Sequence, residues 1–541
     1  MMNDIGVSLV QVYDLAHQLL SDERLNPLLM SSALLCFAEL CHSLPTPTIA
    51  HFGRLMPPFL NILQEQSKEG SDVVTMALIT ALHRLVESLA PFLSAYLTTI
   101  LVQVCLMHVS CTKETGNGVL RQRLESISTH IAHHVPARVL IPAIEESFHK
   151  LSHSAAALAP LMSVLGEFIT SMEKADLKGH LPQLQELVLQ LLAFRRDNPQ
   201  ISDAEVDTVE TSIVGVVTSL SFKLSEVTFR PFFYKIYNWA AVEEPDKNKI
   251  LTFYHLTERL SEMLKSLFVL FAGVFVEHGA DLLVATNSAK TEEDYFDDEA
   301  KSCRLLNHVL ATLTACFHHG GKQFLTRERA AFLLKPLVNQ RSYHVALLYD
   351  KVENELGGEE ATEKRVERHL VPCLASFAAG CEDTTRKEWH QKLLYKMRNS
   401  SAQVRYTTLL VFREAVRKLG DDYLSFLPEA VPFLAELMED ESTEVESLCQ
   451  DVILEVEQIL DIYFKIEISV VYLFCKRSYH VVLLYDKVEN ELGGEEATEK
   501  RVERHLVPCL ASFAAGCEDA TRKEWHQKLL YKMRSSSAQV R

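Results

Sequence analysis

The chain has 541 residues and a mass of 61.2 kDa, which is enough for several domains. Only 19 glycines and 18 prolines occur, which disfavours sandwiches, barrels and long disordered linkers, and a hydrophobic content of 48% excludes disorder of the whole chain. The formal net charge of −18 disfavours a general polyanion binder.

The N-terminal part of the chain has no segment that we interpret as a secretion signal, and it contains one long apolar stretch. Asp4 and Asp14 interrupt the N-terminal apolar residues, and no basic segment precedes them. Residues 88–112 lack Asp, Glu, Lys and Arg and could span a bilayer by length. Because polar residues dilute this stretch and Pro91 stands where a helix would start, we expect a buried helix and no membrane partner. Twelve cysteines without a C-x-x-C pair favour a reducing compartment.

Prolines followed by apolar residues at helical spacing recur along the chain. They lie at positions 58, 91, 142, 182, 372 and 428. The first four are 33, 51 and 40 residues apart, close to the length of a helical-hairpin repeat. A single hairpin cannot bury its apolar face, so this spacing predicts a solenoid of stacked hairpins.

Residues 399–460 contain the clearest predicted hairpin. Apolar residues step by three and four along two helix faces, at Leu424, Leu427, Val431, Leu434 and Met438 and then at Val445, Leu448, Val452, Val456 and Ile459. Val404 and Val445 lie at matching helix starts 41 residues apart, each after polar capping residues, as the second helix of a HEAT repeat begins. The predicted fold is therefore all-α, a HEAT-type helical-hairpin solenoid (α-α superhelix).

Two polar segments interrupt the repeats. Residues 195–207 are predicted to be an exposed linker, and residues 286–301 form an acidic loop with six acidic residues against two lysines. The loop is either a solvated surface segment or a docking strip for a basic partner, anchored by two aromatic side chains. The docking residues would be Glu292, Glu293, Asp294, Tyr295, Phe296, Asp297 and Asp298.

Residues 386–418 have the opposite charge, with nine cations against two acidic residues. Trp389 and Tyr395 lie among the cations, and such a mixture can contact RNA phosphates and bases. The solvated outer faces of two solenoid helices would have the same composition. The candidate residues for contact with RNA or an acidic partner are Arg386, Lys387, Lys392, Lys396, Arg398, Arg405, Arg413, Arg417 and Lys418.

The sequence contains no recognisable catalytic signature. The Gly-Gly-Lys at 320–322 lacks the rest of a phosphate-binding loop, and the H-E-x-x-H and G-x-S-x-G patterns are missing. The best metal candidate consists of Cys303, His308, Cys316, His318 and His319. It lacks a Cys-x(2–4)-Cys knuckle, so we favour ordinary helix packing. We expect a non-enzymatic protein with no cofactor, no metal and no small-molecule substrate.

Residues 341–405 recur almost unchanged as residues 477–541. The two copies differ only at Ala346/Val482, Thr384/Ala520 and Asn399/Ser535, so 62 of 65 positions are identical. Stacking constrains few positions per repeat, so this identity indicates a recent duplication, either in the gene or in the assembly of its sequence. The second copy ends before the helix that should cover its apolar face, and we expect residues 465–541 to pack poorly.

Four segments resemble one known family. They are KLSEVTFRPFFYKIYNWA at 223–240, FLTRERAAFLLKPLVNQ at 324–340, ENELGGEE at 353–360 and FLPEAVPFLAELMED at 426–440. They closely resemble the C-terminal end of the HEAT repeat-containing protein 1 family, the large nucleolar HEAT proteins of the small-subunit processome. The stretches SEVTFRP and PFLAELMED are specific, because unrelated HEAT repeats share only scattered apolar positions.

The resemblance implies a nuclear, nucleolar scaffold that supports pre-ribosomal RNA transcription and processing towards 18S RNA. Its implied partners are processome proteins and, directly or indirectly, pre-ribosomal RNA and the small nucleolar RNA particle. The predicted segments are HEAT-like hairpins over 1–200, a family-type helical domain with the acidic loop over 201–345, further hairpins over 346–464, and a read-through segment with the second copy over 465–541. The alternative is a HEAT adaptor that binds proteins in transport or another large assembly.

Overall fold

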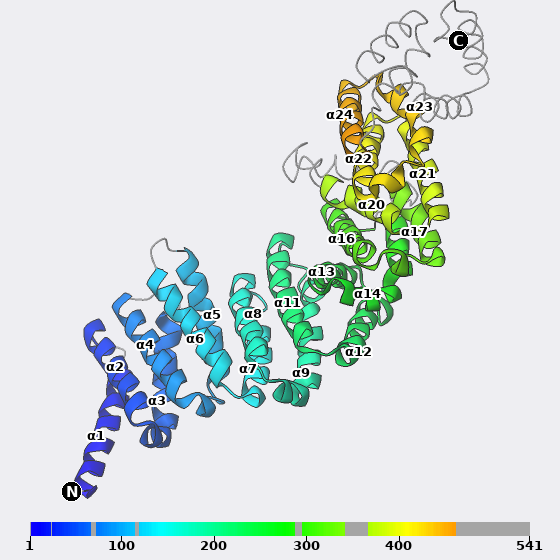
Figure 1. Cartoon of the computed structure of the whole chain (residues 1–541). Coiled ribbons are helices and arrows are strands. Elements are labelled where there is room, and N and C mark those ends of the chain that lie inside the picture. The colour runs from blue at the N-terminus through cyan, green and yellow to red at the C-terminus, as the bar shows by residue number, and fades with distance from the viewer. Residues whose placement is uncertain are drawn as a thin grey trace, which may run out of the picture. The chain divides into compact units, whose positions relative to one another are not determined.

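A computed structural model describes residues 2–22, 24–66, 72–113, 118–286, 295–340 and 366–460. These residues form helices joined by short turns, and no strand occurs among them (Figure 1). They fall into two compact units, the first ending at Leu256 and the second beginning at Thr257. Of the predicted segments, 465–541 and part of 346–464 lie outside the described residues, and the three predicted boundaries between the segments stay predictions.

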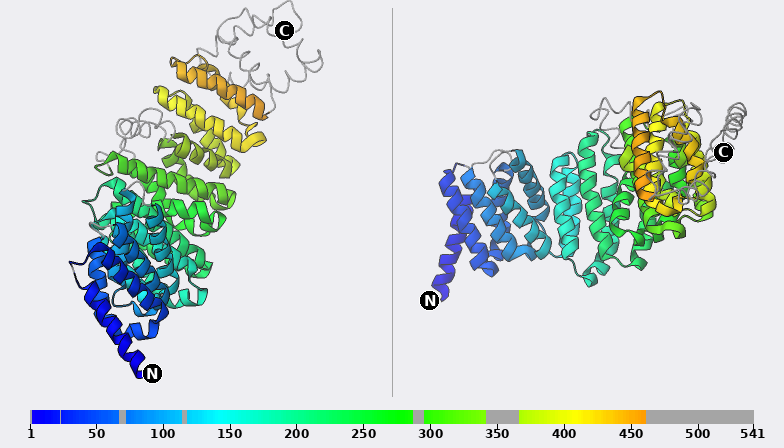
Figure 2. Two further views of the ribbon diagram at one scale, coloured as in Figure 1. Left: turned by 90° about the vertical axis from the view of Figure 1, so that its left-hand side faces the viewer. Right: turned by 45° about the horizontal axis from the view of Figure 1, so that its top comes forward.

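The first unit is built from two layers of helices. Its helices are α1 (Met2–Leu20), α2 (Pro27–Ser43), α3 (Pro45–Gln66), α4 (Asp72–Leu89), α5 (Leu97–Lys113), α6 (Gly118–His134), α7 (Ala137–Leu151), α8 (Ala155–Ser171), α9 (Lys174–Leu192), α10 (Phe194–Asp197), α11 (Asp203–Lys223) and α12 (Glu226–Tyr237), with the short 3-10 helix η1 (Ala90–Phe92) and the short π-helix η2 (Asn238–Val242). One layer contains α2, α4, α6, α8 and α11, each packed on the next, and the other contains α1, α3, α5, α7 and α9 (Figures 1 and 2). Helix α13 (Lys247–Leu264) continues into the second unit.

The second unit repeats this arrangement. Its helices are α14 (Ser266–Ala272), α15 (Val276–Ala285), α16 (Glu299–Phe324), α17 (Arg327–Gln340), α20 (Val371–Gly380), α21 (Asp383–Met397), α22 (Ala402–Leu419), α23 (Leu427–Leu437) and α24 (Thr443–Leu460), with η3 (Gly273–Phe275), η4 (Val366–Leu370) and η5 (Gly420–Tyr423). Helices α14, α16, α20, α22 and α24 form one layer, and α15, α17, α21 and α23 form the other. The prediction of an all-α hairpin solenoid is confirmed.

The recurring prolines mark one layer of the first unit. Pro58 lies inside α3, Pro142 inside α7 and Pro182 inside α9, while Pro91 lies in η1, shortly before α5. These helices succeed one another in the same layer, so the proline spacing in the sequence measures the length of a hairpin.

The apolar stripe predicted for the last described hairpin is mostly buried. Leu427, Val431 and Leu434 are buried on α23, and Val452 is buried on α24. Leu424 is exposed because it precedes α23 and follows η5. The 3.6-residue period therefore holds within each helix and ends at the helix boundary.

The apolar stretch at 88–112 is not one continuous helix, because η1 and a turn separate α4 from α5. Among the described residues, Val73–Phe92 and Ser266–Ala285 are apolar enough to cross a membrane by length and composition alone. The most apolar part of the first segment is 61% buried within the structure and that of the second is 50% buried, as expected of helices that contribute to a solenoid core.

The prediction of an exposed linker over residues 195–207 is wrong. Arg195 lies in α10 and is buried, and α11 begins at Asp203, so only a short turn joins the two helices. The polar residues of this segment form a network with one another, described below.

Gly420 ends α22 with a backbone conformation of φ 53° and ψ −128°. Only glycine adopts this region readily. Replacing Gly420 with alanine should lower the free energy of unfolding by about 1–3 kcal/mol, measured by urea titration followed by circular dichroism.

The matched control is Gly215 on α11, whose helical backbone leaves open space for a methyl group. Gly215→Ala should raise the free energy of unfolding by about 0.5–1 kcal/mol. A loss of stability in both variants, or in neither, would contradict this assignment.

Candidate interaction surface

Arg386, the first cation of the basic stretch, is a buried structural residue. Its Nε donates to the carbonyl oxygen of Ala378 and its Nη2 to that of Cys381, each at 3.0 Å. Its Nη1 lies 3.0 Å from Asp383 Oδ1. The guanidinium therefore fixes the turn between α20 and α21. The prediction that Arg386 contacts RNA or an acidic partner is wrong, because this side chain is buried.

Arg405, at the start of α22, forms a two-pronged ion pair with Asp440 of the next hairpin. Both N–O distances are 2.6 Å, and Nη1 also donates to the carbonyl oxygen of Asn399 at 2.8 Å. Only 13% of the Arg405 side chain and 6% of the Asp440 side chain are exposed. Burial favours a raised pKa for Asp440, but hydrogen bonds from Arg405 and from the Ser442 backbone outweigh it and lower that pKa.

The cations in the C-terminal half of α22 contact side chains of the neighbouring helices α24 and α20. Arg417 Nε donates to Glu455 of α24, and Arg413 Nε lies 4.0 Å from the other oxygen of the same carboxylate. Lys418 Nζ donates to Ser376 Oγ of α20 at 2.6 Å. Hydrogen bonding to Glu455 raises the pKa of Arg417, as expected for a guanidinium held by a carboxylate.

Two cations of α21 contact α23 at more exposed positions. Lys387 Nζ lies 4.0 Å from Glu429 Oε1. Arg398 donates to both Glu436 oxygens at 2.7 and 2.6 Å, and its guanidinium carbon lies 4.2 Å from the ring centre of Phe433. Solvent screens these pairs more than it screens Arg405 and Asp440.

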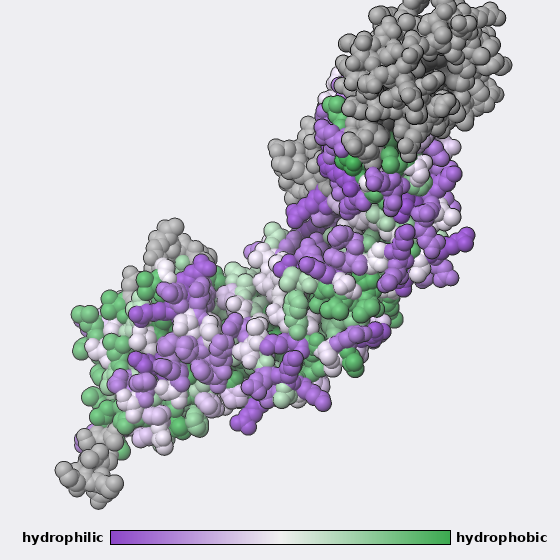
Figure 3. Space-filling view, viewed as in Figure 1, coloured by the Kyte–Doolittle hydropathy of each residue, from purple (hydrophilic) through white to green (hydrophobic). Residues whose placement is uncertain are grey.

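Lys392, Tyr395 and Lys396 complete the outer surface of α21. The Tyr395 side chain is 75% exposed, whereas Trp389 is 1% exposed and belongs to the core. Together with Lys387 and Arg398 they make up the surface that we call the α21 face. Hydrophilic side chains dominate this part of the molecule in Figure 3. Four cations and one aromatic ring thus lie on this face, where Lys387 and Arg398 already pair with carboxylates, and the buried Trp389 is excluded as a platform for bases.

The acidic partners of the basic stretch come from the segment that follows it. Residues 419–460 contain twelve acidic residues and no lysine or arginine. The closest pairs join residues 35 or 38 positions apart, which is about one hairpin. This alternation of charge was the signal in the sequence that could have revealed the pairs.

The acidic loop is described only at its C-terminal end. Glu292, Glu293 and Asp294 lie outside the described residues. Tyr295 and Phe296 pack edge to face at 5.1 Å, and Phe296 is buried, so it cannot act as the exposed anchor that was predicted. Asp297 is exposed, and Asp298 accepts a hydrogen bond from Ala300 N at 2.8 Å, which caps α16.

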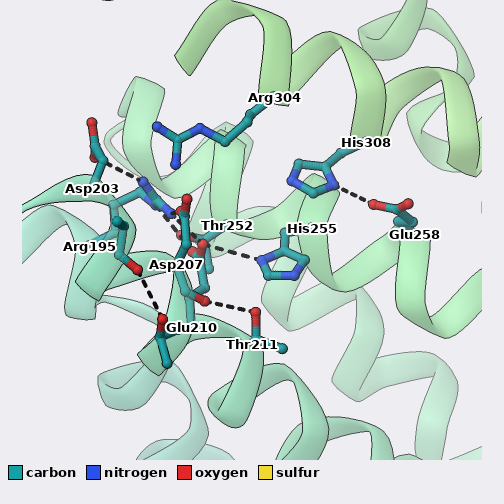
Figure 4. A network of polar contacts seen from close by, with 12 residues as sticks. Arg195, Asp203, Asp207, Glu210, Thr211, Thr252, His255, Glu258, Arg304 and His308 are labelled. Carbon is teal, nitrogen blue, oxygen red and sulfur yellow. Dashed lines mark hydrogen bonds and ion pairs between the residues drawn. The ribbon is translucent and has the colours of Figure 1, made fainter. Parts of the chain in front are cut away.

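A buried polar network joins α10 to α11, and three of its residues, Arg195, Asp203 and Asp207, belong to the segment that was predicted to be an exposed linker. Arg195 Nη2 donates to Glu210 Oε2 at 2.6 Å, and Nε donates to Oε1 at 3.3 Å (Figure 4). The same guanidinium contacts Asp207 and lies 3.4 Å from Asp203. Three carboxylates therefore neutralise one arginine that is almost completely buried.

Glu210 also connects α11 to α13. His255 Nδ1 lies 3.2 Å from Glu210 Oε2, and the Thr252 hydroxyl donates to Oε1 (Figure 4). Burial would raise the pKa of Glu210, but the hydrogen bond with His255 and the charge of Arg195 outweigh it and lower the pKa to about 2. A buried carboxylate held ionised in this way joins helices.

The residues of the metal candidate are not arranged as a metal site. They are Cys303, His308, Cys316, His318 and His319. His308 Nδ1 contacts Glu258, and the rings of the two neighbouring histidines lie 4.7 Å apart. Burial raises the pKa of Cys316, which keeps its thiol protonated. No group of three His, Cys, Asp or Glu side chains among the described residues could hold a metal ion.

Comparison with known proteins places this solenoid in a family. Residues 176–325 match the BP28CT (NUC211) domain. Human HEAT repeat-containing protein 1 is 38% identical over 459 residues, which cover 83% of this chain and 21% of the human protein. The chain belongs to the HEAT repeat-containing protein 1 family. It spans about a fifth of the length of the human relative, and the predicted resemblance is confirmed.

More distant relatives include U3 small nucleolar RNA-associated protein 10 of Chaetomium globosum. It is 25% identical over 444 residues, which cover 79% of this chain and 24% of that protein. Among solved structures, Kap121p bound to RanGTP aligns with 98% of this chain and 56% of its own, with 14% identity and a TM-score of 0.39.

The Arg195 network lies within the residues that match the BP28CT domain. Glu210→Gln should lower the free energy of unfolding by about 3–5 kcal/mol, because it leaves Arg195 buried with less compensating charge. Asp203→Asn is the control, since Asp203 is partly exposed and more distant, and it should cost less than about 1 kcal/mol. Equal losses in urea titrations would contradict this ranking.

The same network should make stability depend on acid. The folded pKa of Glu210 is lowered, so its contribution is fully present above the unfolded pKa of about 4.3. It should be lost as the pH falls from there through about 2. Unfolding free energies measured across this window should converge for the wild type and Glu210→Gln, and a constant difference would count against the assignment.

The ion pairs of Arg405 with Asp440 and of Arg398 with Glu436, which join neighbouring hairpins, should differ in strength according to burial. Asp440→Asn should lower the free energy of unfolding by about 1–3 kcal/mol, because Arg405 is left without its charge partner. Glu436→Gln affects an exposed pair and should cost less than about 1 kcal/mol. Urea titration of both variants tests the order, which a larger loss for Glu436→Gln would reverse.

Proposed function

We propose that this protein is a non-enzymatic scaffold subunit of the small-subunit processome. In this role it supports the transcription of pre-ribosomal RNA and its processing towards 18S RNA. One observation carries the proposal, namely the relationship of most of the chain to proteins named HEAT repeat-containing protein 1 and U3 small nucleolar RNA-associated protein 10. The proposal covers what these 541 residues contribute to such a particle.

The use of polar side chains supports a scaffold rather than an enzyme. The most deeply buried acid among the polar networks described above, Glu210, is satisfied by Arg195 and His255. Asp440 is satisfied by Arg405 in the same way. An active site keeps a reactive group available to substrate, whereas these groups are used to join neighbouring helices.

The α21 face is the proposed contact for RNA. Lys392 and Lys396 supply charge for phosphates, and Tyr395 offers a ring on which a base can stack. Glu429 and Glu436 already pair with Lys387 and Arg398, so phosphate oxygens would compete with carboxylates for those two cations. Binding through this face should therefore be modest and sensitive to salt.

Nucleolar particles provide the direct test. The tagged full chain, purified from nucleolar extract, should recover processome proteins, pre-ribosomal RNA and small nucleolar RNA, identified by mass spectrometry and RNA sequencing. Nuclease treatment before elution separates partners held by protein from those held by RNA. If the protein is found outside the nucleolus and nuclease treatment leaves its protein partners unchanged, the result would support the transport-type adaptor instead.

Charge reversal on α21 tests the RNA contact. Lys392→Glu with Lys396→Glu should weaken binding of a single-stranded RNA by about tenfold or more in filter-binding assays at low salt, and should flatten the salt dependence. The control is Lys174→Glu with Lys178→Glu, an exposed pair with the same spacing on α9. Equal weakening by both double variants would indicate a nonspecific loss of charge and would reject the α21 face.

A further inference from the structure

The first copy of the duplicated segment packs between neighbouring helices of the second unit. Residues 366–404 form η4, α20, α21 and the beginning of α22. Helix α20 packs on α16 and α22, and α21 packs on α17 and α23. We call the surface of α16 and α17 that receives α20 and α21 the first-copy site.

The first-copy site is apolar and closely fitted. The ring of Phe377 lies 5.5 Å from that of Phe317 on α16. A Cβ atom at Gly380 would lie 2.8 Å from Leu325 Cδ1, so this position tolerates only glycine without a shift. Leu374 is completely buried. A segment that occupies this site must therefore keep its apolar residues, and a glycine at this position fits without any shift of Leu325.

The second copy keeps all of them. Residues 502–540 match residues 366–404 at 37 of 39 positions, with Thr384 and Asn399 as the two exceptions. Thr384 is exposed and Asn399 is partly exposed, so neither difference falls on a buried side chain. The counterparts of the buried residues are Val507, Cys509, Leu510, Phe513, Trp525, Leu529, Leu530 and Met533, and Gly516 is the counterpart of Gly380.

The outer surface of α24 is a poor alternative for the second copy. Its exposed residues are Thr443, Glu444, Ser447, Gln450, Asp451, Leu454 and Gln458. One leucine among polar and acidic residues cannot cover the apolar face that α20 buries against α16. The first-copy site is thus the described surface whose shape and polarity fit residues 502–540.

We propose that residues 502–540 occupy the first-copy site whenever residues 366–404 leave it. The second copy belongs to the same chain and is joined to α24 through residues 461–501, so its effective concentration is on the order of millimolar. The first copy is favoured in the wild type because it continues directly into α22, whose Arg405 pairs with Asp440. The second copy is therefore a replacement for α20 and α21 rather than an additional repeat.

Three full-length variants test the exchange. Leu374→Asp places a charge in the buried face of the first copy, Leu510→Asp does the same in the second, and the third variant carries both substitutions. The readout is hydrogen exchange of α16, which α20 covers. Residues 303–317 of α16 occur once in the chain, so their peptides report on the site whichever copy fills it.

The exchange proposal predicts a strongly non-additive result. Leu510→Asp should leave α16 unchanged, and Leu374→Asp should raise its exchange rates less than about tenfold. The double variant should raise them about a hundredfold or more, because no intact copy remains. If Leu374→Asp alone exposes α16 as much as the double variant does, the second copy cannot replace the first and the proposal is overturned.

Two controls complete the design. Thr384→Ala with Asn399→Ser converts residues 366–404 into the sequence of 502–540 and should leave α16 exchange unchanged, whereas a large increase would mean that the second copy does not fit. Light scattering of Leu374→Asp should give the mass of one chain at every concentration tested. A dimer would overturn the intramolecular exchange, because the replacing segment would then come from another molecule.

Discussion

Every hairpin of this solenoid depends on its neighbour to cover an apolar face that it cannot bury alone. Helix α20, for example, packs on α16, where Phe377 meets Phe317, and on α22. Because the stacking partner follows one repeat along the chain, contacts between side chains recur at a nearly constant separation in sequence. Arg398 and Glu436 are 38 residues apart, and His255 and Glu210 are 45 apart.

This constraint assigns most of the basic stretch to structure before any partner is considered. Arg405 and Arg417 form ion pairs with carboxylates of the following hairpin, and Arg386 donates hydrogen bonds to backbone carbonyl groups. A positive stretch of sequence is thus converted into nearly neutral contacts between hairpins. What remains for a partner is the α21 face, where exposure leaves lysine charge and the ring of Tyr395 accessible. Any RNA that binds there must compete with Glu429 and Glu436.

The features predicted from sequence are those that a single helix determines. The apolar stripe through Leu427, Val431 and Leu434 was predictable because its period belongs to one helix. In the first unit Pro58, Pro142 and Pro182 marked hairpins because they lie in successive helices of one layer. Arg195 was missed because a run of charged residues favours solvent locally, and its burial follows from Glu210, fifteen residues away on another helix. Trp389 and Phe296 were misjudged for the same reason, since aromatic residues in polar segments can still point inward.

The duplication shows what stacking does and does not specify. A hairpin's neighbours recognise a few buried positions, such as Leu374 and Gly380, and are indifferent to the exposed Thr384. Two segments that share those buried positions fit the first-copy site equally well, so the contacts in the site cannot distinguish one segment from the other. Chain connectivity makes the distinction, because the first copy runs without interruption into α22, whose Arg405 pairs with Asp440, whereas the second copy is joined to the end of α24 through residues 461–501. In a solenoid, the order of repeats along the chain therefore carries information that the interfaces lack.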